Sequence, residues 1–225
     1  MAKQNNKAAN QKNVEFDELT STEGFFDKYK NILIYSGIGI VVVFLGIVGY
    51  QKFVYGPKEI ESQEVLTDAL YDFDKDSLTT AAQGTADYMG FEEIADEYSG
   101  TSGGDIANYS MGIISMEKGD FELALDYFQQ CDFEDVMIGN MNIGLQGDCY
   151  VELGDYETAV ELFEKAAARE PNEFTTPMYL KKAGLTYEEL GDLDKANIAY
   201  TKIKDEYAQS SEGADIDKYI ARVTK

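Results

Sequence analysis

The side chains that most often carry out chemistry in proteins are scarce in this sequence. It contains no histidine and only two cysteines. The lack of histidine removes the commonest general base, the commonest zinc ligand and every Ser-His or Cys-His arrangement. The sequence also has no G-x-S-x-G elbow, phosphate-binding glycine loop or Cys-x-x-Cys pair. We therefore expect a protein that is not an enzyme and that holds neither a metal ion nor a cofactor.

Carboxylates are the one reactive group in excess. Pairs such as Glu92-Glu93 and Glu188-Glu189 have the chemistry for acid/base work, but the net charge of the chain is −23. From Gly56 onward, 13 Lys and Arg face 37 Asp and Glu, a net charge of −24. Solvated helix faces therefore explain the pairs better than a catalytic site does. Such a domain repels nucleic acid and anionic lipid, which leaves basic or weakly charged partners.

The elements that carry these residues are best defined between residues 140 and 171. Apolar and small residues recur there with helical periodicity on either side of Gly154-Asp155. The glycine can adopt the left-handed conformation that ends one helix, and the aspartate can cap the next. Pro171 closes the unit because proline cannot continue a helix. The stretch predicts a helix, a turn and a second helix.

This unit occurs three times in register. The turns Gly119-Asp120, Gly154-Asp155 and Gly191-Asp192 are 35 and 37 residues apart, close to the 34-residue period of tetratricopeptide repeats (TPRs). Each turn has a glycine seven residues before it, an alanine five residues after it and an aromatic residue four further on: Gly112, Gly147 and Gly184, then Ala124, Ala159 and Ala196, then Phe128, Phe163 and Tyr200. Residues 105–207 resemble the TPR family.

The repeated residue types have a physical purpose. Glycine on the first helix and alanine on the second allow two helices to approach closely, and the aromatic ring fills the space beside them. One unit cannot bury its apolar face alone, so neighbouring units must stack. The alternative is an ordinary helical bundle with accidental spacing. The expected fold is all-α, with a single N-terminal transmembrane helix followed by a TPR-type α-solenoid.

The transmembrane helix is predicted at 29–55. Residues 32–50 carry no charge over 19 positions, between Lys30 and Lys52, which is enough for one span. A cleaved signal peptide fits less well, because the apolar stretch is long and no small-x-small cleavage site follows it. Aromatic residues near both ends are typical of membrane anchors: Tyr29, Tyr35, Tyr50, Phe53 and Tyr55.

Lysines near the span predict its orientation. More of them precede the span than follow it, which places a mostly disordered tail of residues 1–28 in the cytoplasm and the large domain outside. The lysines are Lys3, Lys7, Lys12, Lys28 and Lys30 before the span, and Lys52 and Lys58 after it. Small residues fall on one side of the span, where they would allow packing against another helix, although glycine is common in such helices anyway: Ser36, Gly39, Gly46 and Gly49.

The rest of the chain is expected to flank the repeats. Gly56-Pro57 should start a new helix, two shorter helices broken at Gly84 and Gly90 should follow, and 101–104 should form a loop. Together, 56–104 are expected to form a degenerate first repeat with capping helices. Three repeats then occupy 105–209, and a C-terminal capping helix lies within 210–225.

Cys131 and Cys149 fall where the repeat pattern requires small residues. Two interpretations are open. An extracytoplasmic domain permits a disulfide bond between them. Free cysteine is also among the most buried residue types, which favours two small core side chains.

TPR arrays bind protein segments along the surface formed by the first helix of each repeat. Transferring this pattern from the family predicts a protein-binding groove rich in methionine, which adapts to varied apolar segments. Helical periodicity alone leaves open whether some of these side chains pack in the core instead. The predicted groove residues are Ile106, Tyr109, Ile113, Met116, Met141, Asp148, Val151, Glu152, Met178, Lys181, Leu185 and Glu188.

A short tail, one span and an acidic TPR domain also resemble the YfgM-like family of inner-membrane TPR proteins over nearly the whole chain. The segments 89–91, 147–150 and 202–207, which read MGF, GDCY and KIKDEY, are similar to stretches of such proteins. The resemblance implies a single-pass protein of the bacterial inner membrane, with its C-terminal domain in the periplasm. It also implies an ancillary subunit of the Sec translocon (SecYEG), working beside a membrane-anchored prolyl isomerase chaperone on secreted client chains.

Two further function classes are alternatives to this adaptor. One is a TPR scaffold of another cell-envelope complex, such as the division or cell-wall machinery, in which the groove holds one fixed ligand. The other is an enzyme that uses carboxylates alone, which would need a metal or a substrate near an acidic cluster. The departures from the family pattern are the degenerate first repeat and the lack of residues diagnostic of translocon binding.

Overall fold

The computed structural model describes residues 29–224, and the regular secondary structure in that range consists of helices, apart from one isolated bridge between Gly84 and Met89. The predicted cytoplasmic tail, residues 1–28, lies outside the described residues. The described chain divides into two units, with the boundary between Pro57 and Lys58. A helix from Tyr29 to Asp74 contains an apolar window that is long enough to cross a membrane.

The helix does not restart at Gly56-Pro57, so that prediction was wrong. The backbone stays helical from residue 29 through the π-helical turn η1 (Gln51–Tyr55) into α2 (Gly56–Asp74). Gly56 N–H donates to the carbonyl of Gln51, five residues earlier. A proline ring normally clashes with the carbonyl four residues before it. The wider π turn offers a way to accommodate the ring, and this turn is what the sequence pattern missed.

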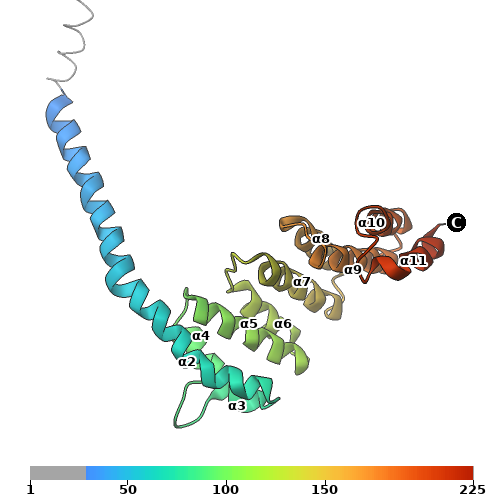
Figure 1. The fold of residues 1–225 in the computed structure, drawn as a ribbon, viewed down its shortest axis with the longest axis horizontal. Coiled ribbons are helices and arrows are strands. Elements are labelled where there is room, and N and C mark those ends of the chain that lie inside the picture. Colours follow the sequence, from blue (N-terminus) through green and yellow to red (C-terminus); the bar gives the residue numbers. More distant parts are fainter. Residues whose placement is uncertain (1–28, 225) are drawn as a thin grey trace, which may run out of the picture. The chain divides into compact units, whose positions relative to one another are not determined.

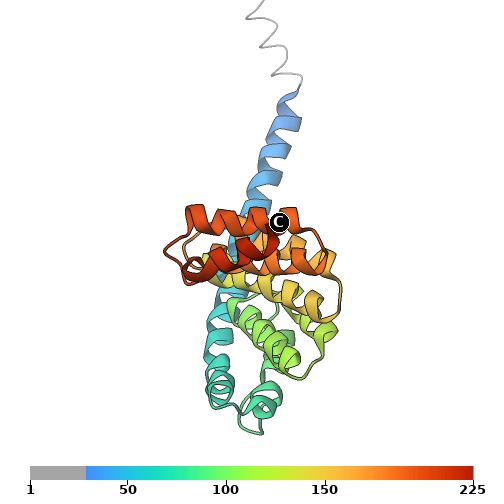
Figure 2. The ribbon, with the colours of Figure 1, turned by 90° about the vertical axis from the view of Figure 1, so that its right-hand side faces the viewer.

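The second unit is an ordered series of helices (Figures 1 and 2). After α2 come two short helices, and then three pairs in which each helix packs against the next along the chain. A short 3-10 turn leads into the last helix. The bounds are α3 (Leu78–Gln83), α4 (Phe91–Glu97), α5 (Ser102–Glu117), α6 (Phe121–Gln129), α7 (Val136–Glu152), α8 (Tyr156–Arg169), α9 (Thr175–Glu189), α10 (Leu193–Glu206), η2 (Gly213–Asp215) and α11 (Ile216–Val223).

The turns inside the three pairs have the predicted conformation. Gly119, Gly154 and Gly191 have φ of +79°, +79° and +77°, in the region that favours glycine. Asp155 accepts a hydrogen bond from Thr158 N–H, and Asp192 accepts one from Lys195 N–H, each at 3.1 Å. Asp120, at the first of the three turns, makes no capping hydrogen bond through its side chain.

Each pair also uses the predicted contact between glycine and an aromatic ring. A Cβ atom on Gly112, Gly147 or Gly184 would lie closer than 3.0 Å to a buried ring on the second helix of the same pair. The three rings belong to Phe128, Phe163 and Tyr200. The glycines are therefore required for close packing of the two helices, as the repeat pattern indicated.

The loop expected at 101–104 is instead the start of α5, which begins at Ser102. Thr101 is its N-cap, and the threonine hydroxyl accepts from Gly104 N–H at 3.2 Å. Gly103 and Gly104 bring the helix start against Ser62 and Tyr98. The predicted break between the two shorter helices is confirmed: α3 ends before Gly84, whose φ is +71°.

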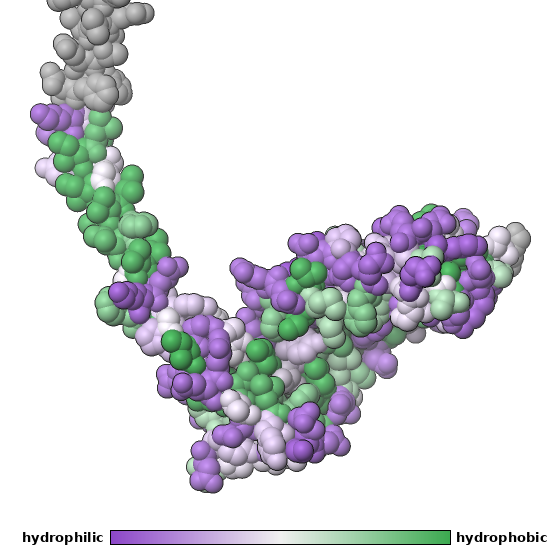
Figure 3. All heavy atoms as spheres, viewed as in Figure 1, coloured by the Kyte–Doolittle hydropathy of each residue, from purple (hydrophilic) through white to green (hydrophobic). Residues whose placement is uncertain are grey.

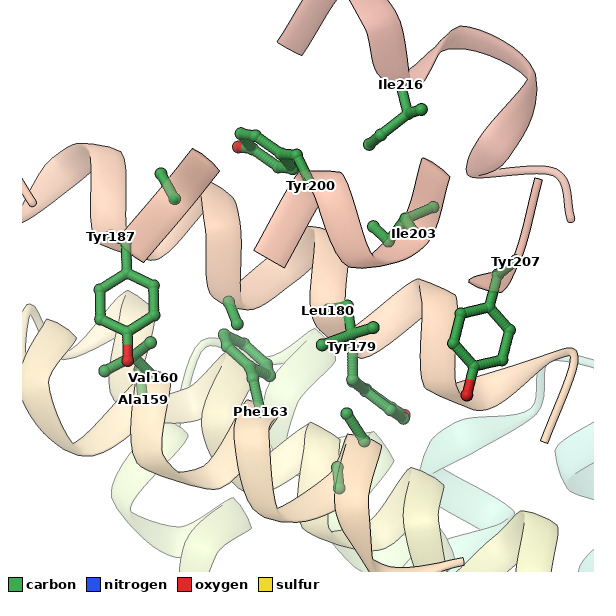
Figure 4. Close-up of a cluster of buried hydrophobic side chains, with 14 of the residues drawn as sticks. Ala159, Val160, Phe163, Tyr179, Leu180, Tyr187, Tyr200, Ile203, Tyr207 and Ile216 are labelled. Atoms are coloured by element: carbon green, nitrogen blue, oxygen red, sulfur yellow. The ribbon is translucent and has the colours of Figure 1, made fainter. Parts of the chain in front are cut away.

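The largest core cluster joins α8, α9, α10 and α11 (Figure 4). Phe163, Tyr200 and Ile203 are completely or almost completely buried in it. The C-terminal helix contributes Ile216 and Val223, so α11 covers the end of the array. A second cluster joins α2, α3, α4 and α5, and a third lies around Phe128 on α6.

Both cysteines are free thiols, and Cys149 is completely buried in the third cluster. Burial raises the pKa of Cys131 and of Cys149 to about 12. Cys131 donates to the backbone carbonyls of Asp105 and Tyr127 at 3.5 Å. Of the two open interpretations, the structure supports a small core side chain for Cys149, whereas Cys131 is half-buried.

Candidate protein-binding groove

The predicted groove positions lie on the first helices of the three pairs, α5, α7 and α9. None of the twelve is fully buried: ten are half-buried, and Glu152 and Leu185 are exposed. The half-buried residues are Ile106, Tyr109, Ile113, Met116, Met141, Asp148, Val151, Met178, Lys181 and Glu188. A position of this kind can pack against the domain with one side and leave its other side open to a ligand.

On α5 these side chains serve the core as well as the surface. Tyr109, Ile113 and Met116 pack against the cluster around Phe128, and Leu145 of α7 packs against the same cluster. The Tyr109 ring lies edge-on to Phe128, with ring centroids 5.8 Å apart. These contacts restrict the α5 side of the surface and join it to α7.

An ion pair connects α7 to α9. Lys182 donates to Asp148 at 2.6 Å, and its ammonium lies over the rings of Phe163 and Tyr179, 5.7 and 6.0 Å from the centroids. Burial raises the pKa of the Asp148 carboxyl, while the hydrogen bond from Lys182 acts in the opposite direction. Because the two charges are paired with each other, neither projects freely into the groove.

A second set of ion pairs connects α9 to η2 and α11. Lys181 donates to Asp215 at 3.3 Å. Glu188 accepts from Arg222 at 2.6 Å and from the Tyr200 hydroxyl at 2.5 Å. Thus α11 continues the row of first helices, and η2 and α11 together occupy two of the predicted groove residues, Lys181 and Glu188. These contacts also give the Glu188 carboxylate a structural role, which differs from the acid/base role open to the Glu188-Glu189 pair.

What remains open on this surface is mainly apolar. Ile113, Met116, Val151, Met178 and Leu185 keep exposed area, and Glu152 is the one exposed charged residue among the twelve. Figure 3 shows hydrophobic residues gathered over α5, α6 and α7, whereas hydrophilic residues dominate around α10 and α11. Such a surface suits a protein segment with apolar side chains, because methionine and aliphatic groups adapt to varied shapes.

Two residues that shape this surface were missed from the sequence. Lys182 pairs with Asp148, and the Tyr179 ring fills the space above Gly144. A Cβ atom on Gly144 would collide with the Tyr179 ring. The sequence does contain a signal for this contact, because Tyr109, Gly144 and Tyr179 are spaced 35 residues apart. The middle repeat therefore has glycine at the position where its two neighbours have tyrosine.

Among the residues predicted to pack in the membrane, Gly39, Gly46 and Gly49 have no neighbouring group within 4 Å of a Cβ position. The hydroxyl of Ser36 donates to the Leu33 carbonyl at 3.0 Å, within the helix. These small residues are therefore uncovered along this helix, and a packing partner for them stays a prediction.

The stability of the domain should increase when the pH is lowered from neutral toward 5. Burial is the main cause that raises the pKa of Asp105 and of Asp148. A carboxyl whose pKa is higher in the folded state binds more protons there than in the unfolded chain, so stability falls as the pH rises above its ordinary pKa of 3.8. The net charge of −24 after Gly56 acts in the same direction through repulsion.

Asp215 has the opposite effect on the pH dependence of stability. The hydrogen bond from Lys218 lowers its pKa below 3.8, so its contribution is lost as the pH falls further. Thermal melts followed by circular dichroism should show the melting temperature rising from pH 7.5 to 5 and falling again below the ordinary carboxyl range. Asp105→Asn should flatten the rise, and Asp126→Asn, an exposed residue on α6, is the control for loss of one charge. An identical rise in Asp105→Asn would contradict the assignment.

Comparison with known proteins agrees with this geometry. Two profiles described as tetratricopeptide repeat match residues 143–173 and 182–210, so the chain contains TPR repeats. These matches cover α8 and α10 completely and most of α7 and α9. No curated protein matches the sequence.

Solved structures also match this chain at low sequence identity. The crystal structure of MamA matches with a TM-score of 0.51 and 15% identity, over 69% of this chain and 91% of MamA. PcrH from Pseudomonas aeruginosa matches with a TM-score of 0.46 and 23% identity, over 56% of this chain and 95% of PcrH. PcrH bound to the chaperone binding region of PopD matches with a TM-score of 0.43 and 22% identity, over 52% and 87%. At these identities the likeness concerns the fold alone.

Proposed function

We propose that this chain is a membrane-anchored TPR adaptor of the Sec protein-translocation machinery, which binds protein segments outside the cytoplasm. The observation that carries the binding role is the largely apolar surface on α5, α7 and α9, in which three of the four charged groove residues, Asp148, Lys181 and Glu188, are already paired. The fourth, Glu152, is exposed. Apolar contact is then the main interaction left for a ligand.

The location is proposed from the span and its flanking lysines. The apolar window within 29–74 anchors the chain, and the lysine excess before it favours a cytoplasmic N-terminus with the repeats in the periplasm. The resemblance to the YfgM-like family supports SecYEG and a membrane-anchored prolyl isomerase chaperone as partners. Secreted chains that emerge from the translocon are the proposed clients.

A pull-down after crosslinking in intact cells tests the adaptor. Recovery of SecY with the tagged native chain would support the Sec assignment. Consistent failure to recover SecY, with division or cell-wall proteins recovered in its place, would replace it with a scaffold of another envelope complex. A mild-detergent purification followed by mass spectrometry identifies the partners in both cases.

Leu185→Asp should separate client binding from the partner complex. Leu185 is 39% exposed, so a charge there can remain hydrated and the fold should be retained. It would, however, place an unpaired carboxylate in the apolar surface, and we expect about a tenfold loss of crosslinked client chains. Leu123→Asp is the matched control, because Leu123 is 45% exposed on the second helix α6. Equal losses in the two variants would contradict the groove.

A further inference from the structure

A hollow that is separate from the predicted groove lies in the last two repeats, between the second helices α8 and α10. Its volume is about 530 Å³, within the range of ligand pockets in proteins. Side chains of α8, α9 and α10 line it: Glu164, Ala167 and Ala168, then Leu180, Ala183 and Tyr187, then Lys195, Ile198, Ala199 and Lys202. None of these residues belongs to the predicted groove.

Helix α9 takes part in both surfaces through different faces. At 3.6 residues per turn, Leu180, Ala183 and Tyr187 share one face, and Lys181 and Leu185 lie on roughly the opposite one. The first face forms the floor of the hollow, where Ala183 and Leu180 are 1% and 8% exposed. The hollow and the groove can therefore be occupied at the same time.

The hollow exists because its walls are built from small residues. Ala167 and Ala168 on α8 face Ala199 on α10, so the two second helices leave space between them. Ile198 projects at the edge of this space and is 68% exposed. An isolated apolar residue on a surface needs no explanation, but an exposed isoleucine beside an alanine-lined hollow offers a continuous apolar contact.

Two lysines and one carboxylate line the hollow, whereas carboxylates outnumber cationic side chains in the domain as a whole. Lys195 and Lys202 lie on α10 about one turn on either side of Ile198. Lys195 pairs with Asp192 at 3.4 Å and lies over the Tyr187 ring, whereas Lys202 has no ion-pair partner among the described residues. The only lining carboxylate, Glu164, accepts from the Tyr187 hydroxyl at 2.7 Å.

We propose that this hollow is a docking site for an acidic, apolar segment of a partner protein, one in which carboxylates flank an aliphatic or aromatic side chain. The apolar side chain would cover Ile198 and enter the alanine-lined space, and the carboxylates would meet Lys195 and Lys202. Elsewhere the domain, with 13 cationic and 37 anionic residues after Gly56, repels such a segment. The local lysines make this hollow the place where it can bind.

The test is a selection from a displayed library of random 12-residue peptides on the full-length chain in detergent. Parallel selections use the native chain, Lys195→Glu/Lys202→Glu, Ile198→Asp and the charge-matched control Lys75→Glu/Lys118→Glu. Peptides that combine Asp or Glu with Leu, Ile or Phe should be enriched on the native chain and on the control. Their binding should weaken about tenfold or more on the other two variants, because two attractions become repulsions or an apolar contact is lost.

Other outcomes would overturn the proposal. Selected peptides that are not acidic would contradict the charge argument. Acidic peptides that bind Lys195→Glu/Lys202→Glu as tightly as the native chain would place their site elsewhere. Circular dichroism of each variant separates a lost site from a lost fold, and hydrogen exchange with a selected peptide should protect α10 rather than α5. A peptide that protects α5 alone would assign it to the groove and contradict this site.

Discussion

Phe163→Ala should lower the free energy of unfolding by about 3–5 kcal/mol, the cost of removing a phenylalanine ring from a packed core. Phe163 is 1% exposed, lies against Gly147 and stacks on Tyr179 with ring centroids 6.3 Å apart. The close approach of α7 to α8 leaves little room for the helices to collapse into the cavity. Urea unfolding of the full-length chain, followed by the helical circular dichroism signal, measures the change.

The matched control for this loss is Phe174→Ala. Phe174 precedes α9 and is 59% exposed, so its removal should cost well under half as much. Similar losses in the two variants would mean that Phe163 does not hold the second repeat together. A change in the slope of the urea transition for Phe163→Ala alone would indicate separate unfolding of the last repeats.

Gly144→Ala should destabilise the domain by about 1–3 kcal/mol, although alanine normally favours a helix interior over glycine. The added methyl group would collide with the Tyr179 ring, which packs across α7 from the next repeat. Tyr179 is 3% exposed and its hydroxyl lies 3.5 Å from the Met141 carbonyl, so the ring has little freedom to move.

The sign of this effect should reverse when the ring is removed. In a Tyr179→Leu background, Gly144→Ala should stabilise the chain by about 0.5–1 kcal/mol, the ordinary gain of alanine in a helix. The four proteins form a double-mutant cycle in which the coupling isolates the contact between the two repeats. A destabilising Gly144→Ala in both backgrounds would show that the glycine is needed for another reason.

The repeated part of the fold was predictable from the sequence because its rules are local. Left-handed glycines at 119, 154 and 191 end helices, and glycines at 112, 147 and 184 admit aromatic rings from a fixed distance along the chain. The break at Gly84 between α3 and α4 followed in the same way. Each signal depends on a residue type at a fixed spacing, which is visible without knowing the tertiary structure.

The features that sequence reasoning missed depend on contacts distant along the chain. Gly103 and Gly104 read as a loop, but they open α5 because Ser62 and Tyr98 press against them. Pro57 indicated a helix start, but a π turn carries the helix through it. Of the groove residues, the sequence placed Lys181 and Glu188 on the surface. It could not show that Asp215 of η2 and Arg222 of α11 would pair with them. The hollow beside Ile198 depends on alanines from two repeats.

The most direct test of the proposed adaptor is site-specific photocrosslinking in living cells during secretion. A photoreactive amino acid would replace Leu185 on the first-helix surface or, as control, the exposed Glu122 on the second helix α6. The proposal predicts crosslinks from position 185 to newly secreted chains, which disappear when secretion is blocked, and few from position 122. Equal labelling from both positions, or labelling at 185 that is independent of secretion, would contradict a client-binding groove on α5, α7 and α9.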